Sequence, residues 1–404
     1  MRTLTVDSLN PAINDVQYAA CGELAIKAEN AMADLAPGVF PKDVIARANE
    51  LSDEISSIGA YSDGQGILLI RKNVAKFIED DIYLIPNTER DGYPSDPNHI
   101  FLTTGASAGH YGVSLPYYLD ELSGWSTSVT SIEAAIEEAE KGNVAAKALV
   151  IINPSNPTGA VLDKATQEQL VKLCEKHSLV LLADEVYQVN LHQPQNYAFT
   201  SFKEIVSRLQ SPVPLVSFHS LSKGVYAEGG RRGGYFECTN ISEEVIALIY
   251  KMVSAGSGPP ISGQIGVDCM VRPPKPGDES YELWKKETDT IHANLASRMG
   301  TIASRLNALP GVSCVDSPGA LYLFPGITFS EKAQEAARAV GKDPDVFYAL
   351  GLLDETGICV EPGSVFGQKE GEWHYRLTCL CPGVDEYIGR LVKFHRGFVE
   401  KYGL

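Results

Sequence analysis

Residues 179–187 form a β-rich apolar run that ends in polar residues, Leu179-Val180-Leu181-Leu182-Ala183-Asp184-Glu185-Val186-Tyr187. A similar run, Ala148 to Asn153, precedes it, and a helical pattern over Thr166 to Lys176 separates the two. Two more β-rich runs follow, at Leu215 to Phe218 and at Gly233 to Phe236. Strands that alternate with helical patterns are typical of a parallel sheet with helices on its faces. We therefore predict an α/β fold for this part of the chain.

The helical pattern carries its own start signal. Thr166 and Gln169 have the spacing of a capping box, in which two side chains satisfy free backbone groups at a helix start. Leu170 and Cys174 recur at helical spacing. We therefore predict that the helix begins at Thr166.

Three of the predicted strands end in polar segments. These segments are Asn153 to Gly159, Asp184 to Tyr187 and His219 to Lys223. In open α/β sheets, ligands bind at the carboxyl ends of the strands. The sequence therefore predicts a ligand-binding site at this edge of the sheet.

The C-terminal part has a different pattern. A helical stretch from Tyr281 to Leu309 ends at Pro310-Gly311, and strand-like pieces follow at Leu321 to Phe324 and at Trp373 to Cys379. This order predicts a second, smaller α+β domain. We expect a large domain over 52–310 and a small domain built from 1–51 and 311–404.

The composition argues against several classes of protein. The 404 residues carry a net charge of −17, which disfavours nucleic acid and anionic membrane surfaces as partners. No apolar run reaches the ~18 residues that a membrane helix needs, and the start, Met1 to Asp7, resembles neither a signal peptide nor a transit peptide. The eight cysteines include no C-x-x-C pair, and we interpret them as reduced core residues. We expect a soluble, cytoplasmic protein.

Two residues at the predicted strand ends have reactive side chains. Asp184 would emerge at the end of a buried strand, where an ionised carboxylate needs a cationic partner. Taken alone, such an Asp is more often a cap or a turn former. Lys223, within Ser220-Leu221-Ser222-Lys223-Gly224, would be a nucleophile towards carbonyls if it were partly desolvated. Taken alone, it is more often a solvated surface residue.

Two further segments could hold an anion. Arg232 lies beside glycines that allow a close backbone approach, and its guanidinium could bind an oxyanion through two hydrogen bonds. The adjacent pair Arg231-Arg232 is otherwise typical of a solvated face. Thr104-Gly105-Ala106-Ser107-Ala108-Gly109 follows the apolar run Ile100 to Leu102 and resembles a strand-to-helix turn whose free amides bind a phosphate.

Long motifs resemble the alanine aminotransferase branch of the fold-type I, class I/II pyridoxal-phosphate-dependent aminotransferases. They include Asn153-Pro154-Ser155-Asn156-Pro157-Thr158-Gly159, Ala183-Asp184-Glu185-Val186-Tyr187-Gln188, Ser217-Phe218-His219-Ser220-Leu221-Ser222-Lys223-Gly224 and Tyr375-Arg376-Leu377-Thr378. The likeness runs nearly end to end. It implies a mostly parallel mixed sheet with helices on both faces plus a smaller α+β domain. It also implies a homodimer, pyridoxal 5'-phosphate as the cofactor, an amino acid and a 2-oxo acid as substrates, and no metal ion.

The resemblance also implies a reaction and a role for each motif residue. The reaction is transfer of the amino group of L-alanine to 2-oxoglutarate, which gives pyruvate and L-glutamate. Lys223 would form a Schiff base with the cofactor, and its released amine would move the substrate proton. Asp184 would keep the pyridine nitrogen protonated, while Asn156 and Tyr187 would hold the phenolic oxygen of the ring. Arg376, together with Asn156, would bind the substrate.

The cofactor phosphate has its own set of implied ligands, one of which comes from a second subunit. The resemblance assigns this role to the amides of Gly105, Ala106 and Ser107, to Ser220 and Arg232, and to Tyr61 of the other subunit.

Two blocks that this family carries are missing from the sequence. One belongs between Asn30 and Phe40 and the other after Gly109, where Pro116 interrupts the helix expected behind the phosphate turn. The aromatic residue that stacks on the cofactor ring belongs to the second block, and nothing in the motif moves that role to Tyr111. We therefore expect a retained two-domain fold that binds the cofactor and converts alanine weakly.

Three alternatives stay open. The chain could be a catalytically weak or inactive protein with an aminotransferase fold, or an aminotransferase with another amino-acid preference. A third reading takes Ser220 and Lys223 as a serine acyl-transfer pair. The Ser-Asp-Asn and Lys-Thr-Gly motifs that accompany that chemistry do not occur in the sequence, which disfavours this reading.

Overall fold

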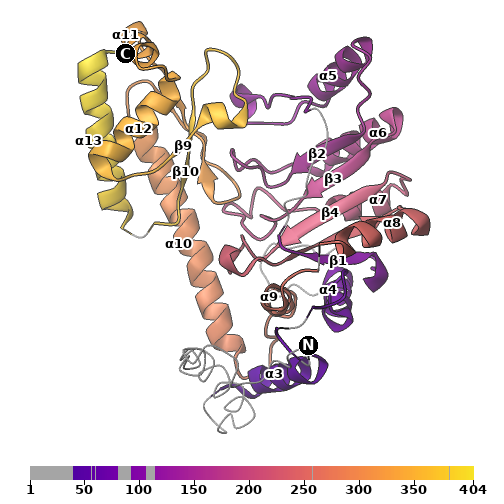
Figure 1. Ribbon diagram of the computed structural model, residues 1–404. Coiled ribbons are helices and arrows are strands. Elements are labelled where there is room, and N and C mark those ends of the chain that lie inside the picture. Colours follow the sequence, from indigo (N-terminus) through magenta and orange to yellow (C-terminus); the bar gives the residue numbers. More distant parts are fainter. Residues whose placement is uncertain are drawn as a thin grey trace, which may run out of the picture. The chain divides into compact units, whose positions relative to one another are not determined.

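The computed structural model describes residues 40–55, 57–59, 61–80, 92–105, 114–256, 258–381 and 383–404 (Figure 1). Contacts between residues divide the chain into two compact units, 1–56 with 274–284 and 57–273 with 285–404. Ala106 and Ser107, both predicted phosphate ligands, lie outside the described residues, as does Tyr111. The predicted domain boundaries at 51/52 and 310/311 stay a prediction.

In the first unit, α3 (Lys42–Glu54) buries Leu51. The start of α3 is fastened to the residues that lead into α10. The Lys42 amide donates to the Glu279 carboxylate at 2.9 Å, and the Ser280 amide donates to the Asp43 carboxylate at 3.2 Å. These carboxylates satisfy backbone amides that have no partner within a helix.

The central sheet of the second unit has the strand order β1-β5-β4-β3-β2. The neighbouring pairs among β2, β3 and β4 are parallel, whereas β5 is antiparallel to both β4 and β1. The predicted mostly parallel mixed sheet is therefore confirmed. The strands are β1 (Ile100–Thr103), β2 (Ala148–Ile152), β3 (Val180–Asp184), β4 (Leu215–Ser220) and β5 (Gly234–Thr239).

The reversed direction of β5 brings a fourth segment to the predicted site. Gly234, at the start of β5, pairs with Ser220, at the end of β4. Asp184 ends the neighbouring strand β3 at the same edge. Arg232 lies two residues before β5 and is therefore near the edge where the parallel strands end.

Helices cover the sheet, as predicted. Helices α5 (Val129–Lys141), α6 (Lys164–His177) and α7 (Phe202–Arg208) lie on one side of it (Figure 1). Their apolar side chains form one buried cluster with Leu149, Leu181 and Leu215 of the parallel strands. Ile246 of α8 (Glu243–Ser254) packs with Phe101 of β1 and Cys238 of β5. Helices α4 (Leu68–Glu79) and α9 (Ile261–Val271) pack against each other.

The start of α6 differs from the prediction. The helix begins at Lys164, and the Asp163 carboxylate accepts the Thr166 amide at 2.7 Å. The predicted capping box at Thr166 and Gln169 is therefore wrong. An Asp side chain is among the strongest N-caps, so the helix starts at the first good cap along the chain.

The C-terminal part confirms the predicted mixture of helices and short strands. Strands β7, β10 and β9 form one sheet in that order, and β6 pairs with β8. The elements are α10 (Tyr281–Asn307), β6 (Val312–Ser313), β7 (Tyr322–Leu323), β8 (Gly326–Ile327), α11 (Glu331–Ala339), α12 (Pro344–Thr356), β9 (Glu361–Pro362), β10 (Tyr375–Thr378) and α13 (Val384–Tyr402).

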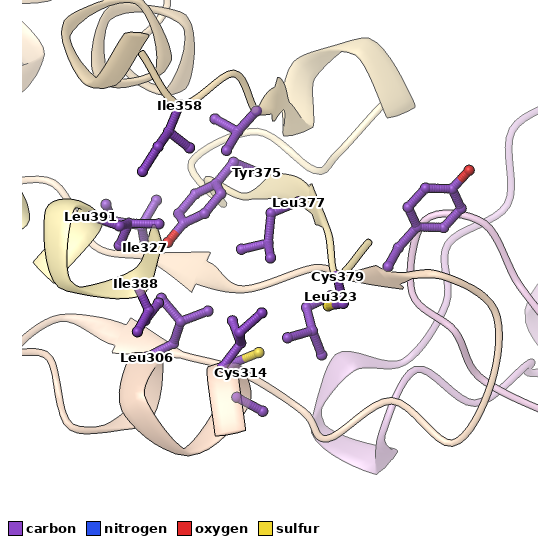
Figure 2. Packing of buried hydrophobic residues seen from close by; sticks show 14 of the residues in the cluster. Leu306, Cys314, Leu323, Ile327, Ile358, Tyr375, Leu377, Cys379, Ile388 and Leu391 are labelled. Carbon is purple, nitrogen blue, oxygen red and sulfur yellow. The ribbon is translucent and has the colours of Figure 1, made fainter. Parts of the chain in front are cut away.

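Strand β10 has one buried face. Figure 2 shows Tyr375 and Leu377 of β10 in an apolar cluster with Ile388 and Leu391 of α13. Successive residues of a strand point to opposite faces. Arg376, between the two buried residues, therefore projects from the other face of β10, away from this core.

The cysteine interpretation is confirmed in part. Cys174, Cys238, Cys314 and Cys379 are buried thiols, whereas Cys269, Cys359 and Cys381 are exposed, so the core interpretation is wrong for the last three. Cys21 lies outside the described residues. None of the helices in the described ranges is long and apolar enough to cross a membrane.

Candidate active site

The predicted nucleophile Lys223 lies among aromatic hydroxyl groups. Its Nζ donates to Tyr322 Oη at 3.0 Å and lies 5.8 Å from the centre of the Tyr187 ring. The hydroxyl groups of Tyr187 and Tyr322 are 3.0 Å apart. The segments after β3 and β4 therefore meet β7, and the predicted pair Tyr187 and Lys223 share one partner, Tyr322.

Asp184 ends β3 in a partly buried position. Burial raises the pKa of its carboxyl group to about 6, and the Val186 amide, which donates to Oδ1 at 3.3 Å, and the Lys223 charge oppose that shift. A carboxylate in a partly desolvated site interacts strongly with a positive charge brought near it. Asp184 can therefore hold a protonated ring nitrogen at this edge of the sheet.

Arg376 and Asn156 meet at the same site. Arg376 Nη1 donates to Asn156 Oδ1 at 2.8 Å. The Arg376 Cζ lies 4.4 Å from the centre of the Tyr322 ring and 4.9 Å from that of Phe366. Stacking on two rings fixes the plane of the guanidinium and leaves its edge for a carboxylate.

Three of the predicted phosphate ligands, Gly105, Ser220 and Arg232, lie close together around tightly packed glycines. Gly105 has a φ of +131°, and a Cβ there would lie 3.1 Å from Arg232 Nη2. A Cβ on Gly234 would lie 2.7 Å from the His219 carbonyl, 3.0 Å from Ser220 Cβ and 3.1 Å from Gly105 Cα. Only glycine allows this approach. Gly105 and Gly234 thus lie packed beside the Arg232 guanidinium and Ser220, and we call these four residues the cradle.

Tyr61 takes no position in this arrangement. It lies in the segment before α4 and is 86% exposed. The described residues thus bring Lys223, Asp184, Tyr187, Asn156 and Arg376 into one region and join Gly105, Ser220 and Arg232 into the cradle. They leave Tyr61 at the surface.

Tyr322 was not predicted from the sequence. Burial alone would raise its pKa, but the hydrogen bonds from Lys223 and Tyr187 and the charges of Lys223 and Arg376 lower it instead. Burial, with Tyr322 beside it, raises the pKa of Tyr187 above its usual range. A sequence signal existed, because a tyrosine inside the apolar piece Leu321 to Phe324 has a buried hydroxyl group that needs a partner.

These residues fit pyridoxal phosphate. The glycine-lined cradle beside Arg232 suits a phosphate group, and Lys223 and Asp184 suit the aldehyde and the pyridine nitrogen of the cofactor. A lysine and a carboxylate placed this way at the ends of neighbouring strands are typical of enzymes that transfer amino groups with this cofactor.

Residues 93–394 match the family model described as aminotransferase class I and II. The chain belongs to this family, and it is a pyridoxal-phosphate-dependent aminotransferase. The predicted cofactor and class of enzyme are therefore confirmed.

Named relatives support this assignment. A probable mitochondrial alanine aminotransferase of Dictyostelium discoideum is 42% identical over 90% of this chain and 74% of its own length. Glutamate–glyoxylate aminotransferase 1 of Arabidopsis thaliana is 41% identical over 90% of this chain and 82% of its own length.

Alanine aminotransferase 2 of Panicum miliaceum is 36% identical over 99% of both chains. That alignment spans 488 positions, more than the 404 residues of this chain, so the relative carries residues that have no counterpart here. This difference agrees with the expected missing blocks.

Solved structures confirm the fold. Alanine aminotransferase from Pyrococcus furiosus superposes with a TM-score of 0.69 over 96% of this chain and 100% of its own, at 20% sequence identity. At that identity the likeness establishes the predicted fold of this chain and nothing about its substrates.

Proposed function

We propose that this chain transfers the amino group of L-alanine to 2-oxoglutarate and so forms pyruvate and L-glutamate. The observation that carries the proposal is that the Lys223 amine and the Arg376 guanidinium both contact the side chain of Tyr322. The alanine aminotransferases among the relatives support the choice of amino acid.

In this proposal each residue has one task. Bound pyridoxal phosphate supplies an electron sink for the electron pair left when a substrate loses its α-proton. Lys223 attaches the cofactor and then carries that proton. Asp184 stabilises the protonated pyridine nitrogen, and Tyr187 and Asn156 donate to the ring oxygen. Arg376 binds the substrate carboxylate through two parallel hydrogen bonds, which fixes the α-carbon within reach of the lysine.

The phosphate of the cofactor is assigned to the cradle. Gly105, Ser220 and Arg232 would hold it, and Ala106 and Ser107, outside the described residues, are proposed to add their amides. We assign the residues 52–310 to the large domain that carries these groups, and 1–51 with 311–404 to the small domain.

We propose a homodimer in which Tyr61 reaches the phosphate of the second subunit. The exposed Tyr61 supports this, and so does a nearby apolar stripe on α8, where Val245, Leu248 and Met252 recur at helical spacing and are 45%, 60% and 75% exposed. Tyr250 of α8 donates to Asp63 at 3.2 Å, so the segment that carries Tyr61 adjoins α8. An apolar stripe of this kind is typical of a protein–protein interface.

A cytoplasmic location is also proposed. The reduced thiols of the described cysteines support a reducing compartment. The name of the Dictyostelium relative places that protein in mitochondria. Fractionation of the source cells with an antibody against the chain separates the two locations.

Two variations on this function, a second amino acceptor and a reduced rate, are each supported by one observation. The glutamate–glyoxylate aminotransferase among the relatives favours glyoxylate as a second amino acceptor. The length difference from the Panicum relative favours weak cofactor binding and slow turnover.

The visible spectrum of the purified chain tests the proposal. We expect added pyridoxal phosphate to give a protein-bound absorption band that L-alanine converts to the spectrum of the pyridoxamine form and that 2-oxoglutarate restores. Glyoxylate in place of 2-oxoglutarate tests the second acceptor. A band that no amino acid changes would contradict transamination.

A further inference from the structure

We propose that Tyr322 is a positioning residue that holds the Lys223 amine and joins it to the carboxylate-binding Arg376. The inference rests on the proposed function of Lys223 and Arg376 and adds a residue to that site. Tyr322 is 4% exposed and lies on β7, whereas Lys223 follows β4 and Arg376 lies on β10. One buried side chain thus contacts groups from two other segments.

The Tyr322 hydroxyl group has a defined set of partners. A lysine ammonium can only donate, so the oxygen of Tyr322 accepts from Lys223 Nζ at 3.0 Å. The second contact joins the hydroxyl oxygens of Tyr322 and Tyr187, which are 3.0 Å apart. Either hydroxyl group can donate its hydrogen in this bond. These two bonds orient the lysine amine over the region between the tyrosine rings.

The Tyr322 ring performs a second task. The Arg376 guanidinium stacks 4.4 Å from its centre, and the Tyr187 ring meets it edge-on at 5.7 Å. Backbone pairing also fixes the position of the residue, because Tyr322 pairs with Thr378 of the strand that carries Arg376. The ring therefore sets the distance between the clamp for the substrate carboxylate and the amine that acts on the α-carbon.

The two tasks are separable by substitution. Tyr322→Phe keeps the ring beneath Arg376 and removes only the oxygen that accepts from Lys223. The hydrogen bond holds the Lys223 amine against the Tyr322 oxygen. Without this bond, the amine is free to turn towards an electrophile.

Chemical labelling of lysines in the cofactor-free protein tests the proposal without requiring turnover. The purified chain is treated with trinitrobenzenesulfonate at pH 8, and the extent of modification at each lysine is followed by peptide mass spectrometry. We expect Tyr322→Phe to accelerate labelling of Lys223 about tenfold, since hydrogen bonds to charged groups have that magnitude. Asp184, whose carboxylate interacts with the Lys223 charge, and Arg376, which stacks on the same ring, are unchanged in this variant.

Two controls separate positioning from loss of structure. Lys203 is 3% exposed and pairs with Glu237 at 2.7 Å, so its labelling reports unfolding. Tyr348→Phe removes another buried hydroxyl group, which contacts His395 at 3.0 Å, and should leave labelling of Lys223 unchanged.

Faster labelling of Lys223 in Tyr322→Phe, with Lys203 still protected, supports the proposal. An unchanged rate at Lys223, or an equal acceleration in Tyr348→Phe, overturns it. If Tyr322→Phe exposes Lys203, Tyr187→Phe replaces it. This variant keeps the Lys223–Tyr322 hydrogen bond, so Lys223 should be labelled at close to the wild-type rate, and a tenfold acceleration overturns the proposal. Wild-type protein that carries no aminotransferase activity would contradict the proposed function while leaving this labelling result intact.

Discussion

The Arg376 guanidinium donates to Asn156 Oδ1 at 2.8 Å, although 220 positions separate the two residues in the sequence. An amide oxygen orients the guanidinium without cancelling its charge. Glu361, the carboxylate nearest to Arg376, is 3.9 Å away and half exposed, so it neutralises the charge weakly. Arg376 is therefore held in place and still available to a substrate carboxylate.

Replacement of Arg376 by lysine tests this role. Arg376→Lys keeps a positive charge but loses the planar pair of donors, so we expect the KM values for alanine and 2-oxoglutarate to rise at least tenfold. Binding of pyridoxal phosphate, measured by absorbance titration, should not change. An equal loss of cofactor affinity would place Arg376 at the phosphate instead.

The cradle depends on the absence of a side chain at Gly234. A Cβ there would lie 2.7 Å from the His219 carbonyl oxygen, which belongs to the backbone and cannot move aside easily. We expect Gly234→Ala to weaken binding of pyridoxal phosphate about tenfold or more, because it pushes apart the residues around the phosphate.

Gly230→Ala is the matched control for that measurement. A Cβ at Gly230 meets no atom within 4 Å, and the residue lies close to Arg232 in the sequence. If both variants bound the cofactor with wild-type affinity, the cradle would not be the phosphate site.

Asp184 should make the stability of the cofactor-free chain depend on pH. Burial raises its folded-state pKa from 3.8 to about 6. The folded protein therefore holds this proton more tightly than the unfolded chain does. The stabilisation is complete below pH 3.8 and is lost as the pH rises through 6.

Asp184→Asn removes that dependence. We expect the difference in free energy of unfolding, Asp184→Asn minus wild type, to increase by roughly 2 kcal/mol as the pH rises from 4 to 7. Urea unfolding of both proteins across this range provides the measurement. Parallel curves for the two proteins would show that Asp184 is ionised at its ordinary pKa.

The missing blocks are expected to reduce affinity for the cofactor. A chimera that carries the corresponding segment of the Panicum relative after Gly109 should bind pyridoxal phosphate more tightly and convert alanine faster. The physical reason is that a helix behind the phosphate turn would add aligned amides and cover apolar surface. A chain as active as the chimera would contradict the interpretation of the missing blocks as damaging.

Much of the fold was predictable because local patterns and tertiary structure agree. The apolar runs that end at Asp184 and Ser220 are strands, and their polar ends meet at one edge, as the rule for open α/β sheets requires. The start of α6 was not predictable, since Asp163 and Thr166 are both good caps and only the folded chain shows which one is used.

Residues of the proposed site could be named from the sequence where a motif holds them and not elsewhere. Lys223 and Arg376 stand within long motifs, whereas Tyr322 stands in a short apolar piece and acquires its role from two distant partners. The direction of β5 could not be predicted either, because the sequence pattern of a short strand is the same in parallel and antiparallel pairing. That direction is what brings Arg232 beside Gly105.

Transfer of an isotope tests the central claim most directly. The purified chain, supplied with pyridoxal phosphate, is incubated with 15N-labelled L-alanine and unlabelled 2-oxoglutarate, and the glutamate formed is analysed by mass spectrometry, with Lys223→Ala as the control. We predict that 15N accumulates in glutamate, together with an equal amount of pyruvate, in the wild-type protein and not in the control. Long incubation makes the result independent of a slow turnover. Glutamate without 15N, or equal labelling with Lys223→Ala, would contradict an aminotransferase that acts on alanine through Lys223.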